Sequence, residues 1–172
     1  MRNHDESGTS GQKNSGTIRR GWAKADLIFG LIILASFAAI LVFKMNGRPA
    51  ETPEAFANHT TMTVASQHSA ESGKPLLVLA TASWCGPCQS FKRGALSDEA
   101  IGKYITDTTE PVYLDIDEHP DEARTLGINS IPTLMLVRDG QIVSRNTGVM
   151  NIRQTKSWLE EALAKAKLSR AG

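Results

Sequence analysis

Residues 76–88 read LLVLATASWCGPC, and this stretch decides the fold. It holds the only two cysteines of the 172-residue chain, Cys85 and Cys88. The apolar run at residues 76–80 predicts a buried strand, and a helix is expected to follow. Cys85 then lies at a helix N-terminus, where unpaired N–H groups and the helix dipole favour an exposed, easily ionised thiolate. We therefore predict Cys85 as the nucleophile, and Cys88, buried one turn further on, as the resolving cysteine.

Two other interpretations of the cysteine pair are weaker. A structural zinc site normally has four ligands, and none of the four histidines is at ligand spacing from the cysteines. A purely structural disulfide would gain little stability from so short a loop. Trp84, Gly86 and Pro87 make the pattern more specific than C-x-x-C alone, so we predict reversible disulfide exchange with other proteins.

Three sequence-distant motifs together resemble the thioredoxin-like family. They are residues 84–88, residues 126–133 (LGINSIPT), and Asp139-Gly140 followed by Gly148. The resemblance runs from about Lys74 to Lys167. It implies an α/β thioredoxin-like fold, with a mixed central sheet and helices on both faces.

The pattern of the chain agrees with that fold class, because strands and helices alternate before a hairpin and a last helix. Strands are predicted at residues 75–80, 112–116, 133–137 and 141–144, with Asp139-Gly140 as the hairpin turn. Helices are predicted at residues 60–72, 85–93, 100–105 and 120–126, and from Asn151, where Gln154 completes a capping box.

The resemblance also implies the remaining site residues. It predicts a cis Ile131–Pro132 bond facing the cysteines, with the Ile131 backbone free to pair with an extended substrate. The implied substrate-docking residues are Trp84, Gly86, Pro87, Ile131, Pro132 and Gly148. No metal and no organic cofactor are expected, because the Cys85/Cys88 disulfide is itself the redox group.

The chain departs from the thioredoxin pattern in two places. The position six residues before Cys85, where thioredoxins usually carry a buried Asp, holds Leu79, and Tyr113 stands where a nearby Lys is usual. Residues 91–104 are more similar to the periplasmic C-terminal domain of bacterial thiol:disulfide interchange reductases. Without a buried carboxylate, we expect Cys88 to be activated by another route or to resolve more slowly.

The N-terminal part predicts a membrane anchor. Residues 27–43 are 17 uncharged, mostly apolar residues, the short end of a membrane-spanning helix, and Trp22 stands at its interface. Basic residues are more numerous before this run than after it, which puts the N-terminus in the cytoplasm. We predict a disordered cytoplasmic tail at residues 1–24, one transmembrane helix at 25–44, a linker at 45–58 and the thioredoxin-like domain at 59–172. A cleaved signal peptide, with Ser36-Phe37-Ala38 as the cleavage motif, is the alternative.

These features predict a single-pass protein of the inner membrane whose C-terminal domain lies in the periplasm. It would reduce disulfides of exported proteins, with electrons from a membrane donor, and Gly-Pro between the cysteines matches reducing members of the fold. The net charge of +1 gives no reason to expect a nucleic-acid partner. A thiol oxidase or isomerase of the same fold, and a non-catalytic docking or chaperone module, remain alternatives. The sequence leaves the substrate, the electron donor and the oligomeric state open.

Overall fold

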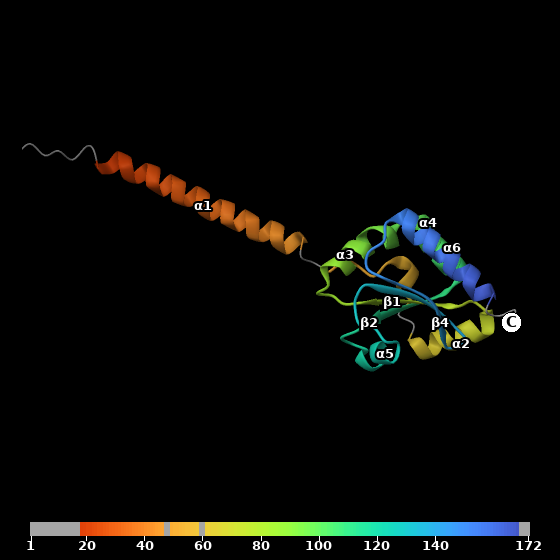
Figure 1. The fold of residues 1–172 in the computed structure, drawn as a ribbon. Helices are drawn as coiled ribbons and strands as arrows, with labels where there is room; N and C mark the ends of the chain where they lie inside the picture. Colours follow the sequence, from red (N-terminus) through yellow and green to blue (C-terminus); the bar gives the residue numbers. More distant parts are fainter. Residues whose placement is uncertain (1–17, 47–48, 59–60, 169–172) are drawn as a thin grey trace, which may run out of the picture. The chain divides into compact units, whose positions relative to one another are not determined.

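The computed structural model describes residues 18–46, 49–58 and 61–168, with side chains of the first helix at residues 27–42. The chain divides into two units, Met1–Arg48 and Pro49–Gly172 (Figure 1).

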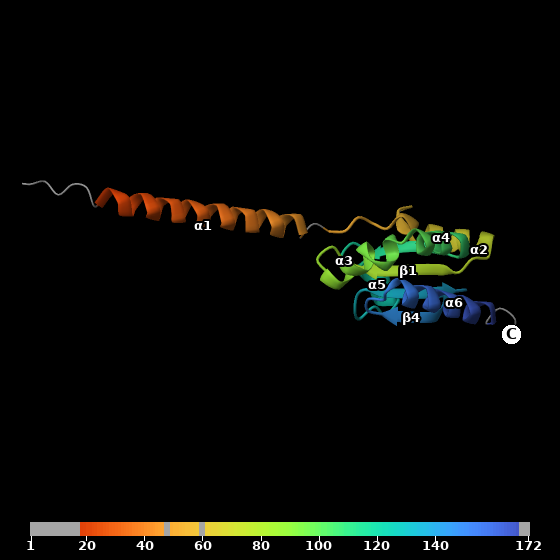
Figure 2. The ribbon, with the colours of Figure 1, turned by 90° about the horizontal axis from the view of Figure 1, so that it is seen from above.

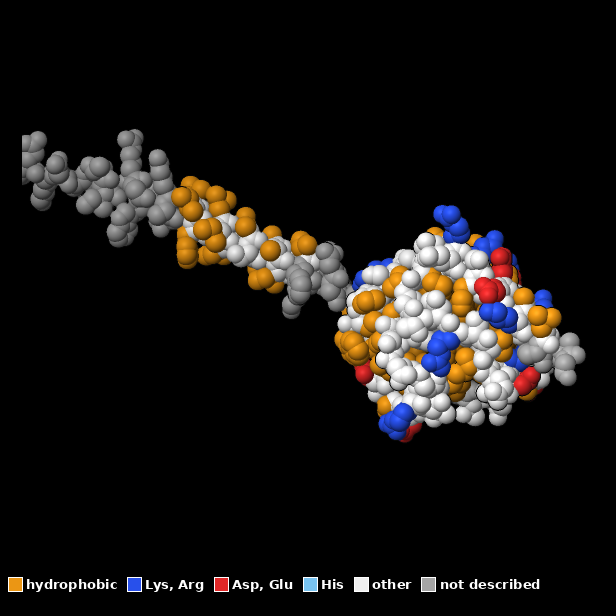
Figure 3. Space-filling view, viewed as in Figure 1, with side chains coloured by type: hydrophobic (Ala, Val, Ile, Leu, Met, Phe, Trp, Pro, Cys, Tyr) orange, Lys and Arg blue, Asp and Glu red, His pale blue; other side chains and the backbone are white. Residues whose placement is uncertain are grey.

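The first unit contains helix α1, Ile18–Asn46. Its large apolar side chains between Leu27 and Val42 are exposed, as the orange atoms along the helix in Figure 3 show. Within the described ranges, no helix combines the length and the apolar character needed to cross a membrane. The transmembrane segment predicted at residues 25–44 is therefore not confirmed. Of the predicted tail, residues 18–24 are helical instead of disordered, and residues 1–17 lie outside the described residues.

The second unit is built on a mixed four-stranded sheet in the order β2-β1-β3-β4. The strands are β1 (Leu76–Thr81), β2 (Glu110–Asp115), β3 (Thr133–Arg138) and β4 (Gln141–Thr147). Strand β1 is parallel to β2 and antiparallel to β3, and β3 and β4 form the predicted hairpin. Asp139 and Gly140 make its turn with φ of 50° and 76°, the left-handed geometry that matches strand twist.

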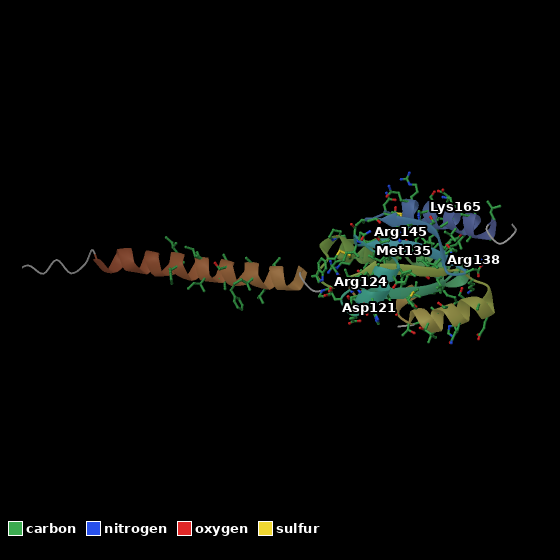
Figure 4. All side chains as sticks on the ribbon, turned by 60° about the horizontal axis from the view of Figure 1, so that its bottom comes forward. Asp121, Arg124, Met135, Arg138, Arg145 and Lys165 are labelled. Atoms are coloured by element: carbon green, nitrogen blue, oxygen red, sulfur yellow. A yellow bond between two sulfur atoms is a disulfide. The ribbon has the colours of Figure 1, made fainter. Side chains whose placement is uncertain are left out.

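Helices cover both faces of this sheet, as predicted: one group lies above the strands and another below them in Figure 1, and Figure 2 looks down on the upper group. The helices are α2 (Met62–Ser72), α3 (Gly86–Arg93), α4 (Glu99–Thr108), α5 (Pro120–Thr125) and α6 (Ile152–Leu168). One core lies between the sheet and α3, α4 and α6, and includes Leu77, Leu79 and Phe91. The other lies between the sheet and α2 and α5, and includes Val78, Ala80 and Met135, which is labelled in Figure 4. Since both faces are covered, all six residues of β1 are buried, which explains its unbroken apolar run.

Helix ends follow the predicted capping signals. Asn151 Oδ1 accepts from the Gln154 N–H at 2.9 Å, and Gln154 Oε1 accepts from the Asn151 N–H at 3.0 Å, so the capping box is confirmed. Helix α2 ends at Gly73, whose φ of 69° is the left-handed conformation that glycine adopts without strain.

The segment predicted as a linker ends earlier than residue 58. From Pro49 the chain belongs to the compact second unit, and the short 3₁₀ helix η1 (Glu54–Phe56) buries Ala55 and Phe56 in the core beside α4. Phe56 is only 1% exposed. The sequence missed this because prolines and polar residues around a single aromatic side chain give no periodic signal. We call residues 49–57 the strap.

Candidate redox site

The ends of the four strands bring the predicted site residues together at one edge of the sheet. Ala80, near the end of β1, pairs with Thr133, the first residue of β3, and Thr133 pairs with Thr147 at the end of β4. Thr81 pairs with Asp115 at the end of β2. Cys85, Pro132, Gly148 and Asp117 follow or precede these strand ends by one to four residues, so the sheet register itself places them near one another.

Cys85 and Cys88 form a disulfide with an S–S distance of 2.09 Å and a Cα–Cα distance of 5.2 Å. Cys85 is the N-cap of α3, as predicted, and its Sγ accepts from the Cys88 N–H at 3.2 Å. The same N–H would stabilise a Cys85 thiolate after reduction, because a helix N-terminus favours negative charge.

Both sulfur-bearing residues are well packed. Cys88 is 1% exposed, as expected for the inner cysteine, but Cys85 is 5% exposed and so less open than the sequence suggested. Ala82 packs with the two cysteines, and Ile116 and Ile131 cover this cluster. Cys85 therefore presents little surface to solvent, and the packed side chains surround both sulfur-bearing residues.

The Ile131–Pro132 peptide bond is cis, as the resemblance predicted. The Ile131 carbonyl oxygen lies 3.9 Å from Cys85 Sγ, and Pro132 is buried. Gly148 donates its N–H to the Pro132 carbonyl at 2.8 Å and has a φ of 103°, which L-residues rarely adopt. A Cβ at Gly148 would have no neighbouring atom within 4 Å, so backbone conformation, not crowding, favours glycine there. The docking roles of these three residues stay predictions.

Trp84 lies on the surface beside the cysteines, with 67% of the residue exposed. Its indole Nε1–H donates to Asp117 Oδ2 at 2.7 Å, a charge-assisted hydrogen bond. Asp117 is itself oriented, because its N–H donates to Asp115 Oδ1 at 3.0 Å. Sequence analysis missed Asp117, since nothing in the spacing of two residues 33 positions apart indicates contact.

Replacing Asp117 with Ala removes the hydrogen bond to the Trp84 indole and is expected to let the ring rotate. Because one hydrogen bond is lost, the KM for a protein disulfide should rise about threefold. Asp117→Asn keeps an acceptor oxygen and should restore most of the affinity. The measurement is steady-state reduction of a protein disulfide, together with Trp84 fluorescence anisotropy. An unchanged KM in Asp117→Ala, with a freely rotating indole, would show that the orientation of Trp84 does not matter for docking.

Gly86 and Pro87 form the first turn of α3. Proline is tolerated there because first-turn N–H groups have no helical partner. A Cβ built on Gly86 would touch nothing in the domain, so the space above it is open to a partner. This agrees with the predicted role of Gly86, which itself stays untested.

The position six residues before Cys85, where thioredoxins usually carry a buried Asp, holds no carboxylate in this structure. Leu79 is 1% exposed and belongs to the apolar core. The buried polar groups near α3 are instead Gln89 and Lys92, at 7% and 2% exposed, and Lys92 Nζ donates to the Tyr113 hydroxyl at 3.0 Å. Sequence analysis missed both, because polar residues on a helix ordinarily predict a solvated face.

Other described features lie apart from the disulfide. Arg145 of β4 (Figure 4) donates to the Leu126 and Gly127 carbonyls at 2.5 and 2.7 Å and so supports the loop that leads to Ile131. A cavity of about 370 Å³ lies at the opposite edge of the sheet, between the residues before β1 and the end of β3, lined by Lys74, Tyr104 and Arg138 among others. Over the residues that the structure describes, no three His, Cys, Asp or Glu side chains group as metal ligands.

Comparisons with known proteins agree with this geometry. The thioredoxin family model matches residues 57–161. The chain is 40% identical to a thioredoxin-like protein of Synechocystis over 85 residues, which are 49% of this chain and 78% of that protein. It is 43% identical to a thioredoxin of Mycobacterium bovis over 77 residues, 45% of this chain and 64% of that protein.

A solved thioredoxin from Thermus thermophilus is similar in fold. The superposition has a TM-score of 0.56 and covers 61% of this chain and 85% of that one, at 19% sequence identity. At this level of sequence identity, the superposition shows that the two chains share a fold, and it says nothing about substrates or partners.

Proposed function

Since this chain belongs to the thioredoxin family and is a protein-disulfide oxidoreductase, we propose that it reduces disulfides of exported proteins while tethered to a membrane. The observation that carries the redox part is the closed Cys85–Cys88 disulfide at the N-terminus of α3, with the Ile131 carbonyl 3.9 Å from Cys85 Sγ. A backbone acceptor beside a helix-capped sulfur suits an extended client strand that brings its own disulfide to Cys85.

The proposed cycle starts from the dithiol. The Cys85 thiolate attacks one client sulfur, the client S–S bond breaks, and the released client thiolate takes a proton. Cys88, deprotonated, then attacks Cys85 Sγ, which forms the Cys85–Cys88 bond and releases the second client thiolate. Two electrons pass from the domain to the client, and a separate dithiol protein must return them. No metal or organic cofactor enters this scheme.

Support for the reducing direction comes from the residues between the cysteines. Gly86 and Pro87 place no charged side chain between the cysteines, and Cys85 Sγ lies against two uncharged backbone groups, the Cys88 N–H and the Ile131 carbonyl. A cation beside the thiolate would favour the dithiol and make the disulfide a stronger oxidant. A low, thioredoxin-like reduction potential follows from the proposal.

The membrane tether is supported by sequence features of the first unit. Residues 27–43 carry no charge, the large apolar side chains that the structure describes in α1 are exposed, and basic residues are concentrated before them. Large exposed apolar surfaces normally bind lipid or protein. We propose that α1 associates with the inner membrane, with the thioredoxin domain on the periplasmic side and a membrane protein as electron donor.

Cys88→Ser in the full chain is expected to leave mixed disulfides between Cys85 and its clients, because the attack that releases them is removed. Cells expressing this variant are lysed after acid quenching, membranes are separated, and disulfide-linked proteins are identified after reduction. We expect disulfide-linked exported proteins in the membrane fraction of cells with Cys88→Ser. The double variant Cys85→Ser/Cys88→Ser should capture no disulfide-linked protein. Clients that are all cytosolic would overturn the location, and the absence of any linked protein would count against the reductase.

A further inference from the structure

Two polar side chains of α3 are buried on the same side of the helix. Gln89 is 7% exposed and Lys92 is 2% exposed, and residues three apart are neighbours on a helix surface. Lysine is almost never buried without partners, and buried polar groups are normally hydrogen-bonded. Their partners therefore indicate why this face of α3 is polar.

Both side chains bind the backbone of one strap residue, Ala50. The Ala50 N–H donates to Gln89 Oε1 at 2.5 Å, and Lys92 Nζ donates to the Ala50 carbonyl at 3.1 Å. Lys92 also lies 5.5 Å from the Tyr113 ring centroid. The strap is thus attached to the helix that carries Cys88 through both backbone groups of a single residue.

Gln89 makes a second set of contacts, to the loop that carries Cys85. Its Nε2 donates to the Ala82 carbonyl at 3.1 Å and to the Ser83 carbonyl at 3.0 Å. The orientation of the amide follows from its partners, since a backbone N–H requires the oxygen and two carbonyls require the nitrogen. One side chain therefore joins the strap, α3 and residues 82–83, immediately before Trp84 and Cys85.

We propose that Gln89 is a positioning residue for disulfide exchange, and that the strap holds it in place through Ala50. In the oxidised domain the S–S bond itself keeps Cys85 next to Cys88. When Cys85 is bonded to a client, that restraint is gone, and the Cys85 loop is held against α3 by the chain through Gly86, by the helix cap, and by side-chain contacts to residues 82–83. Gln89 supplies two such contacts and so raises the effective concentration of Cys88 at the mixed disulfide.

This role is specific to the resolving step. Cys88 thiolate must reach Cys85 Sγ, form the intramolecular bond and expel the client thiolate, so its rate depends on how the loop and α3 are aligned. The first attack, by Cys85 on a free disulfide, needs no such alignment. The inference rests on the proposed roles of Cys85 and Cys88, and a small aromatic disulfide that releases a coloured thiol tests it without any knowledge of clients.

The test compares variants of the full chain, fully reduced and mixed with the aromatic disulfide in stopped flow. One coloured thiol is released on attack by Cys85 and the second on resolution by Cys88. Gln89→Met, of similar length, removes all three hydrogen bonds. We expect it to slow resolution about tenfold, from the loss of two loop contacts, and to leave the first phase within twofold of the wild-type rate. Gln67→Met, the same substitution at an exposed position of α2, is the matched control and should change neither phase.

Two further variants separate the contacts. Gln89→Glu keeps the acceptor for Ala50 but turns an oxygen toward two carbonyls, and it should slow resolution at least as much as Gln89→Met. Ala50→Pro leaves every side chain of α3 unchanged, removes the Ala50 N–H and fixes the backbone φ of residue 50, and should slow resolution about threefold. If Gln89→Met does not fold, Ala50→Pro tests whether the contact between the strap and Gln89 speeds resolution.

Equal slowing of both phases, or resolution in folded Gln89→Met at the wild-type rate, would overturn the positioning role. In that case Gln89 only stabilises the fold. Failure of the proposed function looks different, because the wild-type domain would then exchange with the aromatic disulfide but would not speed the reduction of a protein disulfide.

Discussion

Replacing Cys85 with Ser is expected to reduce disulfide exchange by the full chain to the uncatalysed background. The hydroxyl of serine is not ionised near neutral pH, so the position at the N-terminus of α3 would no longer hold a nucleophile. Cys88 cannot replace it, because it is 1% exposed and lies under the packed cluster of Ala82, Ile116 and Ile131. The measurement is the initial rate of thiol release from a protein disulfide with reductant in excess.

Cys88→Ser is the matched control for this prediction, since it removes a sulfur of the same disulfide. It should retain the first attack and release one thiol per chain before it stops. The reverse pattern, a silent Cys88→Ser and an active Cys85→Ser, would mean that the two roles are exchanged. Full activity in Cys85→Ser would exclude the redox mechanism and leave a docking module.

Replacing Phe56 with Ala is expected to lower the unfolding free energy of the domain by about 3–5 kcal/mol, the usual cost of truncating a fully buried Phe. Phe56 is 1% exposed and lies in the core formed with α4, α6 and the sheet. That loss is a large part of the total stability of a small domain. Urea denaturation of the full chain, followed by tryptophan fluorescence, measures it.

Phe37→Ala makes the same substitution at an exposed position, because Phe37 of α1 is 59% exposed. It should leave the urea midpoint of the thioredoxin domain unchanged. If Phe56→Ala cost less than about 1 kcal/mol, as surface substitutions do, residues 49–57 would be the free linker that the sequence indicated. A large cost shows instead that the domain begins at the strap.

Local sequence determined the redox-active cysteine pair and the strand, turn and helix that surround it. An apolar run followed by small residues and C-G-P-C specifies strand, turn and helix within some twenty positions, and each capping signal acts on its own helix end. These features depend on neighbours along the chain, so the strand, the helix-capping Cys85, the hairpin turn and the Asn151 capping box were all predictable. The cis bond at Pro132 came from the family resemblance, since most X–Pro bonds are trans.

Tertiary structure alone decided which polar groups meet. Ala50 with Gln89, Lys92 with Tyr113, and Trp84 with Asp117 are 39, 21 and 33 positions apart. Such bonds form only when the fold brings the two partners within about 3 Å of each other, and no periodicity or spacing in the sequence records that. For the same reason polar Gln89 and Lys92 suggested a solvated helix face, whereas the strap covers them and makes them part of the site.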